Sequence, residues 1–137
     1  LTAAAANWLG RLKMRRPLYH APPPGHPVID ALGSPQAMLT GVLDKLDALA
    51  VDVSSFEADH ICFRCATVDE YRSVCALLAQ NGQLLVESMI GGRPIATYLL
   101  AEPILFRSYS IRCIEVPCPK PGRPYASGWE HVEFVIG

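Results

Sequence analysis

The feature that most constrains the fold is a sharply bounded helix that lies between strand-like segments within residues 58–116. Thr67 and Glu70 have the spacing of a capping box, in which the two side chains bind free amides at a helix N-terminus. Apolar residues with helical spacing follow over residues 71–78, and Gly82 is expected to end the helix in a left-handed conformation. The segment is therefore predicted to form one amphipathic helix.

Strand-like segments surround this helix, each rich in apolar residues and bounded by turn-forming ones. They cover residues 58–66, 83–89, 95–100 and 106–116. Gly91 and Gly92 predict a hairpin turn that leaves Arg93 exposed, and Pro103 is expected to interrupt the strand pairing. The order β-α-β-β-β predicts an α+β domain in which residues 58–116 form one module.

Less regular segments flank this module. Residues 34–49 predict an amphipathic N-terminal helix. Residues 17–35 are rich in proline and predict an extended linker, in which His20 and His26 are solvated. Residues 1–16, alanine-rich and then basic, could be a helix, an organellar targeting stretch or residues added for expression. We therefore expect a tail and linker over residues 1–33 and a globular domain over residues 34–137.

Composition narrows the classes of function. The 137 residues, 50% hydrophobic and 18% charged, can bury a core, and the net charge of −1 gives no general attraction to nucleic acid or to an anionic membrane. No apolar run approaches the roughly 20 residues that cross a bilayer. The five cysteines are an odd number and lie mostly within predicted elements, which favours buried thiols in a reducing compartment. A cytoplasmic location is expected, with organellar targeting as the alternative.

Two histidines on predicted strands are the strongest candidates for chemistry. Alternation puts His60 opposite the apolar residues of ADHICFRC, and it puts His131 opposite those of GWEHVEFVIG. If a curved sheet turns these polar faces inward, the two imidazoles line one cavity. Residue spacing alone also fits histidines that are merely exposed or satisfied within the core.

Carboxylates near these histidines would complete a binding site for Zn, Fe, Mn or Ni. The candidates are Glu115, in the segment IRCIEVP, and Glu133, which shares a face with His131. Asp59 and Glu130 directly precede the histidines and are predicted to face away from them.

The segments ADHICFRC, GGRPI and GWEHVEFVIG, in this order, resemble the YecM family of bacterial proteins, over about residues 36–137. That family is assigned to the vicinal-oxygen-chelate superfamily of glyoxalases and extradiol dioxygenases. The resemblance implies paired βαβββ modules around a metal cavity. It implies metal ligation by His60 on the first strand of one module and by His131 on the first strand of the next. Glu115, near the end of the first module's last strand, matches a glutamate of the isomerase-type members.

The chain also departs from that pattern, because residues 130–137 supply only the first strand of a second module. Its last strand carries the remaining carboxylate in dioxygenase-type members. We expect a longer natural protein, with a partner chain or a degenerate site as the alternatives, and we expect exposed apolar surface with self-association into a possible homodimer.

The function expected from these features is divalent-metal binding, related to metal-dependent isomerases, lyases and dioxygenases that act on small oxygenated substrates. The alternatives are a non-catalytic module that binds a small molecule and, third, an assembly domain that uses an open sheet edge. No nucleic-acid or membrane partner is expected.

Overall fold

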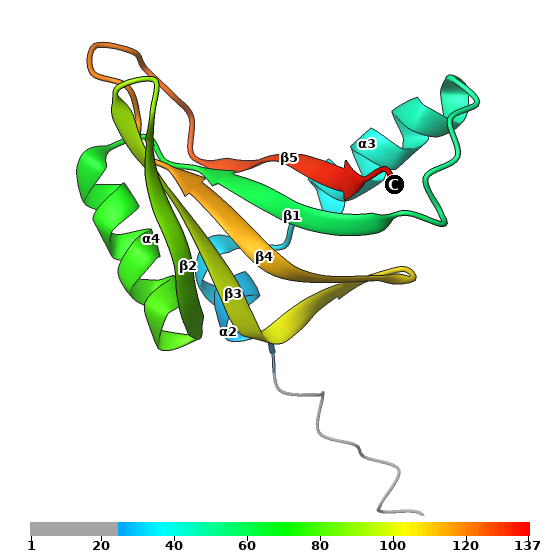
Figure 1. Cartoon of the computed structure of the whole chain (residues 1–137), viewed down its shortest axis with the longest axis horizontal. Coiled ribbons are helices and arrows are strands. Elements are labelled where there is room, and N and C mark those ends of the chain that lie inside the picture. The colour runs from blue at the N-terminus through cyan, green and yellow to red at the C-terminus, as the bar shows by residue number, and fades with distance from the viewer. Residues whose placement is uncertain (1–24) are drawn as a thin grey trace, which may run out of the picture.

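A computed structural model describes residues 25–137 of the chain, so the predictions for residues 1–24 lie outside the described part. The protein is α+β, and its elements follow one another as shown in Figure 1. The helices are α2 (Pro27–Leu32), α3 (Gln36–Ala48) and α4 (Val68–Gln80). The strands are β1 (Glu57–Arg64), β2 (Gly82–Ile90), β3 (Arg93–Phe106), β4 (Tyr109–Pro117) and β5 (Gly128–Val135).

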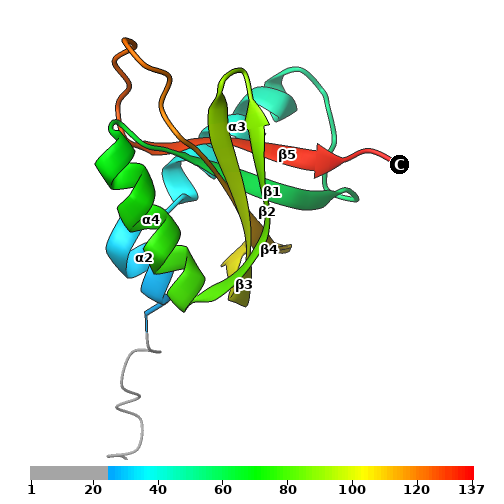
Figure 2. The same ribbon diagram turned by 60° about the vertical axis from the view of Figure 1, so that its left-hand side comes forward.

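The strands form one mixed sheet in the order β2-β3-β4-β1-β5. β1 pairs with β4 in parallel, and the other neighbours are antiparallel. Helices α4 and α2 lie on the same side of this sheet, as Figure 2 shows. The predicted β-α-β-β-β order is confirmed, and the strand that follows it becomes the edge strand β5 beside β1.

The capping box of α4 forms as predicted. The Glu70 amide donates to Thr67 Oγ1 at 3.0 Å, and the Glu70 carboxylate accepts from the Ala66 amide at 3.0 Å. The left-handed stop at Gly82 is wrong, because Gly82 is not among the residues with positive φ. A Cβ at this position would lie 2.2 Å from the Leu99 carbonyl oxygen, so the close approach of β3 requires glycine here.

The extended linker predicted over residues 17–35 is also wrong in its C-terminal part, where helix α2 forms. His26 is no solvated linker residue: its Nδ1 accepts from the Val28 amide at 3.2 Å, and its Nε2 lies 2.8 Å from the Glu102 carbonyl oxygen. Pro27 occupies the first turn, where a missing amide costs nothing. The globular unit thus begins before Ser34.

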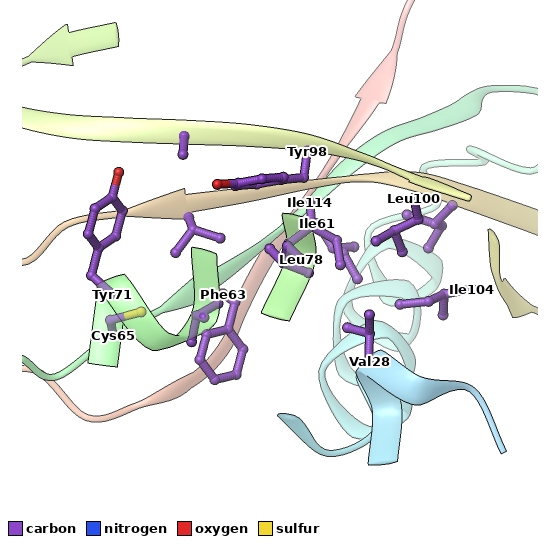
Figure 3. Packing of buried hydrophobic residues seen from close by; sticks show 14 of the residues in the cluster. Val28, Ile61, Phe63, Cys65, Tyr71, Leu78, Tyr98, Leu100, Ile104 and Ile114 are labelled. Carbon is purple, nitrogen blue, oxygen red and sulfur yellow. The ribbon is translucent and has the colours of Figure 1, made fainter. Parts of the chain in front are cut away.

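The core lies between the helices and one face of the sheet (Figure 3). At one end, Val28 of α2 packs beside Leu100 and Ile104 of β3. Residues from β1, α4 and β4 fill the centre, among them Ile61 and Leu78, which are fully buried. Because Val28 is 0% exposed, α2 is a structural part of the domain.

The hairpin between β2 and β3 is confirmed, since Gly91 and Gly92 have φ values of +62° and +80°. Two details differ from the sequence prediction. β3 continues through Pro103 with a register shift between Leu99 and Ile104, instead of ending before it. Arg93 is half-buried, not exposed.

Strand β2 forms the opposite edge of the sheet and carries apolar side chains that face solvent. The exposed ones are Leu84, Leu85, Val86, Met89 and Ile90. Within the described residues, none of the helices has the length and apolar character needed to span a bilayer.

Candidate metal centre

The candidate ligands lie on three neighbouring strands, on the face opposite the core. Cys62 of β1 pairs with Glu115 of β4 on one side and with His131 of β5 on the other. His60 is two residues before Cys62, so it points to the same face. This register brings together residues that are far apart in the sequence.

The three side chains converge closely enough for one ion. One potential ligand atom from each of His60, Glu115 and His131 lies within 4.8 Å of the others. His60 Nε2 is 3.5 Å from Glu115 Oε2, and His131 Nε2 is 4.0 Å from Glu115 Oε1. Ligand atoms of a tetrahedral zinc site with bonds of about 2.0–2.1 Å lie about 3.3 Å apart. Small side-chain rotations would therefore bring this set to ligating distance, and the residues fit a divalent metal.

His60 is oriented by the residue beside it. Its Nδ1 lies 2.8 Å from Asp59 Oδ2, and the residue is only 8% exposed. Its Nε2 is buried and has no hydrogen-bond partner among the described residues. A histidine that donates Nδ1–H to a carboxylate presents the Nε2 lone pair, which is the usual arrangement for a metal ligand.

The prediction that Asp59 faces away from His60 is therefore wrong. The cause is a break in the pairing of β1 with β5 between Ala58 and His60, which disturbs the strict alternation of side chains. The bulge leaves Asp59 on the accessible side of the strand, where it reaches the neighbouring imidazole.

Glu133, the other sequence candidate, lies at the open side of the cluster. Its Oε1 is 3.7 Å from His60 Nε2 and 4.0 Å from His131 Nε2. The side chain is 62% exposed, whereas that of Glu115 is 26% exposed. Glu133 can therefore reach both imidazoles, but its environment fixes it less.

A second group, Cys62, Glu130 and His131, also has ligand-type atoms within 4.8 Å of one another. A second irregularity in β5, between the pairs Cys62–His131 and Phe63–Trp129, brings Glu130 to the side of Cys62, 3.9 Å from its Sγ. The prediction that Glu130 faces away is wrong for this reason. Burial raises the pKa of the Cys62 thiol, so it keeps its proton at neutral pH and is the poorer ligand.

A cavity of about 100 Å³ adjoins the cluster, with Glu115 and His131 in its wall. Arg64 pairs there with Glu130 and lies 4.8 Å from the centre of the Tyr125 ring. Sequence reasoning missed this lining. The alternation of β3, whose core residues are Ala96, Tyr98 and Leu100, could have placed Arg93 and Ile95 on the cavity face, whereas the loop that brings Tyr125 carries no such signal.

Comparison with known proteins gives consistent matches. The family model described as "YecM protein" matches residues 32–137. Protein YecM of Escherichia coli K12 is 38% identical over 98 residues, which are 69% of this chain and 50% of that protein. An uncharacterized protein of Haemophilus influenzae Rd is 31% identical over 88 residues, which are 64% of this chain and 46% of that one. The chain thus spans about half the length of these curated relatives.

A solved structure described as "Structural Genomics, Protein EC4020" has a similar fold, with a TM-score of 0.69 and 32% sequence identity. The similarity covers 80% of this chain and 60% of the other. The α+β architecture with its mixed sheet is therefore shared with a protein of known structure.

Proposed function

The chain belongs to the YecM protein family, and we propose that it binds a divalent metal ion through His60, Glu115 and His131, in the manner of the vicinal-oxygen-chelate proteins. The substrate class that we assign is a small oxygenated molecule, and the reaction is of the isomerase, lyase or dioxygenase type. The activity of the whole protein is part of this proposal, because the relatives are about twice as long as the matched segments.

One observation carries the proposal: a buried imidazole nitrogen without a partner. A buried polar atom that lacks a hydrogen bond costs about 1–3 kcal/mol. His60 Nε2 has no partner within residues 25–137, while Nδ1 is held by Asp59 and two carboxylates lie within 4 Å of Nε2. Ligation of an ion would satisfy the nitrogen and balance the charge of Glu115 and Glu133 at the same time.

The strand order supports the finer fold assignment. A βαβββ module requires the parallel pairing of its first and last strands, and β1 pairs with β4 in this way. β5 then stands where the second module's first strand would lie, antiparallel to β1. His60 and His131 thus take equivalent places on adjacent strands.

When bound, a divalent ion supplies Lewis acidity toward a substrate oxygen. The chain's own residues have distinct tasks around it. Asp59 fixes the tautomer of His60, and Glu115 is the carboxylate held most firmly, since it projects from a central strand. Glu133 is the exposed carboxylate at the open side of the cluster, where it can accept a proton from a substrate.

Metal titration tests the proposal. The purified chain is stripped with EDTA and titrated separately with Zn²⁺, Mn²⁺, Ni²⁺ and, without oxygen, Fe²⁺, by isothermal titration calorimetry. One ion per chain is expected, with a loss of at least tenfold in affinity for His60→Ala, Glu115→Ala and His131→Ala. Glu57→Gln is the matched control, because Glu57 is an exposed carboxylate on the same strand as His60. A wild-type chain that binds none of the four ions would refute the proposal.

The second candidate is a non-catalytic module that binds a small molecule, and the cavity beside the cluster favours it. The two candidates differ in their dependence on metal. A ligand that binds with equal affinity before and after EDTA treatment would favour the binding module.

A further inference from the structure

Arg93 stands at the far end of the cavity from the candidate metal ligands. It is the first residue of β3, directly after the Gly91–Gly92 turn, and its side chain lines the cavity together with Ile95. Thr97 of the same strand pairs with Glu115. Arg93 and Thr97 are four positions apart along the strand, which is about 13 Å between their Cα atoms. The cavity therefore has a carboxylate and imidazole end and a guanidinium end.

The charge of Arg93 is unused within the described structure. Its Nε is buried without a hydrogen-bond partner, and no acidic side chain of residues 25–137 forms an ion pair with it. The other arginine of the cavity, Arg64, is already bound by Glu130 through two hydrogen bonds. A buried guanidinium nitrogen without a hydrogen bond costs free energy. Arg93 is therefore expected to bind a hydrogen-bond acceptor that is not part of the chain.

The remaining lining defines the acceptor further. Two arginines and two glutamates line the cavity, so the lining alone is close to neutral and a divalent ion would leave it positive. Ile95, Pro117 and Pro119 add apolar surface to the lining. A cavity of about 150 Å³ can hold benzene, so about 100 Å³ limits the enclosed part of a substrate to a short chain.

We propose that Arg93 binds the carboxylate group of a short substrate whose other oxygen function reaches the metal cluster. The inference rests on the proposed function and names its substrate class: a small carboxylic acid with a second oxygen group at the opposite end. A planar guanidinium binds a carboxylate through two parallel hydrogen bonds, which fixes orientation as well as charge. Phosphate fits less well, because it is too short to contact Arg93 and the metal cluster at the same time.

The experiment uses malonate, succinate and glutarate as probes of increasing length. Each is titrated into the Zn²⁺-loaded chain and the EDTA-treated chain by calorimetry, with succinamide as the uncharged analogue and inorganic phosphate as the tetrahedral anion. The variants are Arg93→Gln, which keeps the polar side chain and removes the charge, and Arg123→Gln, a matched control in the exposed part of the loop after β4. Zn²⁺ affinity is measured for each variant as an independent readout.

We expect at least one dicarboxylate to bind the loaded chain, and Arg93→Gln to weaken it about 10- to 100-fold, as for the loss of a charged hydrogen-bond pair. Arg93→Gln should bind Zn²⁺ with the affinity of the wild type, and Arg123→Gln should bind the dicarboxylate with the affinity of the wild type. Succinamide should not bind to the wild type or to either variant. Equal dicarboxylate affinity in wild type and Arg93→Gln overturns the inference and leaves the proposed function intact. So does stronger binding of phosphate than of all three dicarboxylates.

Failure of the proposed function looks different. A wild-type chain that takes up none of the four ions refutes the metal site. The EDTA-treated titrations then decide the role of Arg93 alone, because its contact with a carboxylate does not require the ion. Loss of dicarboxylate binding on Arg93→Gln in that form supports the contact. Absence of binding to both forms of the wild type overturns it.

Discussion

Replacing Asp59 by alanine removes the acceptor that holds Nδ1 of His60, while the ligand atom Nε2 stays in place. The two atoms are 2.8 Å apart in the wild type. Loss of such a partner lowers metal affinity by about 10- to 100-fold. Because the Asp59 side chain is 56% exposed, water can partly replace it, and the lower end applies: about tenfold, or about 1.4 kcal/mol.

The substitution Asp59→Asn gives the matched comparison, because an amide oxygen still accepts from Nδ1–H but carries no charge. Charge-assisted hydrogen bonds are about twice as strong as neutral ones, so this variant should lose only about threefold in affinity. Competition between the chain and a chromophoric chelator for Zn²⁺ measures both values, and Glu57→Gln on the same strand should match the wild type. An unchanged affinity in Asp59→Ala would refute the role of this carboxylate and weaken the assignment of His60 as a ligand.

Three further predictions concern the fold. Val28→Ala should lower the free energy of unfolding by about 1–3 kcal/mol, because it opens a space in the core beneath α2; an unchanged urea midpoint would mean that α2 is dispensable. Gly82→Ala should lower the free energy of unfolding by about 1–3 kcal/mol, since its Cβ would meet the Leu99 carbonyl. In Gly41→Ala the added Cβ points into open space in α3, so this variant should be neutral or stabilised by roughly 1 kcal/mol. Similar urea midpoints for both glycine variants would contradict the crowding at Gly82. Burial raises the pKa of Cys65 and of Tyr98 to about 12. The contribution of these neutral groups to the free energy of unfolding is therefore complete below the unfolded pKa values of about 8.5 and 10, and it is lost as pH rises toward 12. Urea midpoints that stay constant from pH 8 to pH 11 would refute this prediction.

Local patterns in the sequence were sufficient for most of the secondary structure. The capping box at Thr67, the helical stripe after it and the glycine pair at Gly91 each specify a conformation through neighbours a few residues away. Helix α2 was missed because its proline-rich composition hides a short helix that tertiary packing stabilises. His26 and Val28 become informative only when β3 lies beside them.

The candidate site, too, was only partly predictable from the sequence. Alternation along the strands predicted the polar faces of His60 and His131, whereas Glu115 was matched only through the family resemblance. The structure brings the three side chains together. Asp59 and Glu130 were misplaced because bulges alter the alternation, and a bulge depends on the pairing between strands that a single segment does not reveal. Arg93 was predicted to be exposed at the turn, although the alternation of β3 places it on the cavity face.

The position of β5 at the edge of the sheet has a consequence for hydrogen exchange. Among residues 25–137, β5 pairs only with β1, so His131 and Glu133 lie on a strand with one ladder of hydrogen bonds. His60 and Glu115 lie on strands that are paired on both sides. Edge strands can open locally at a free energy well below that of global unfolding. An ion bound by residues of β1, β4 and β5 would make this local opening of β5 less frequent. The amides of β5 should then exchange more slowly with metal than without it, while those of β3 should change little.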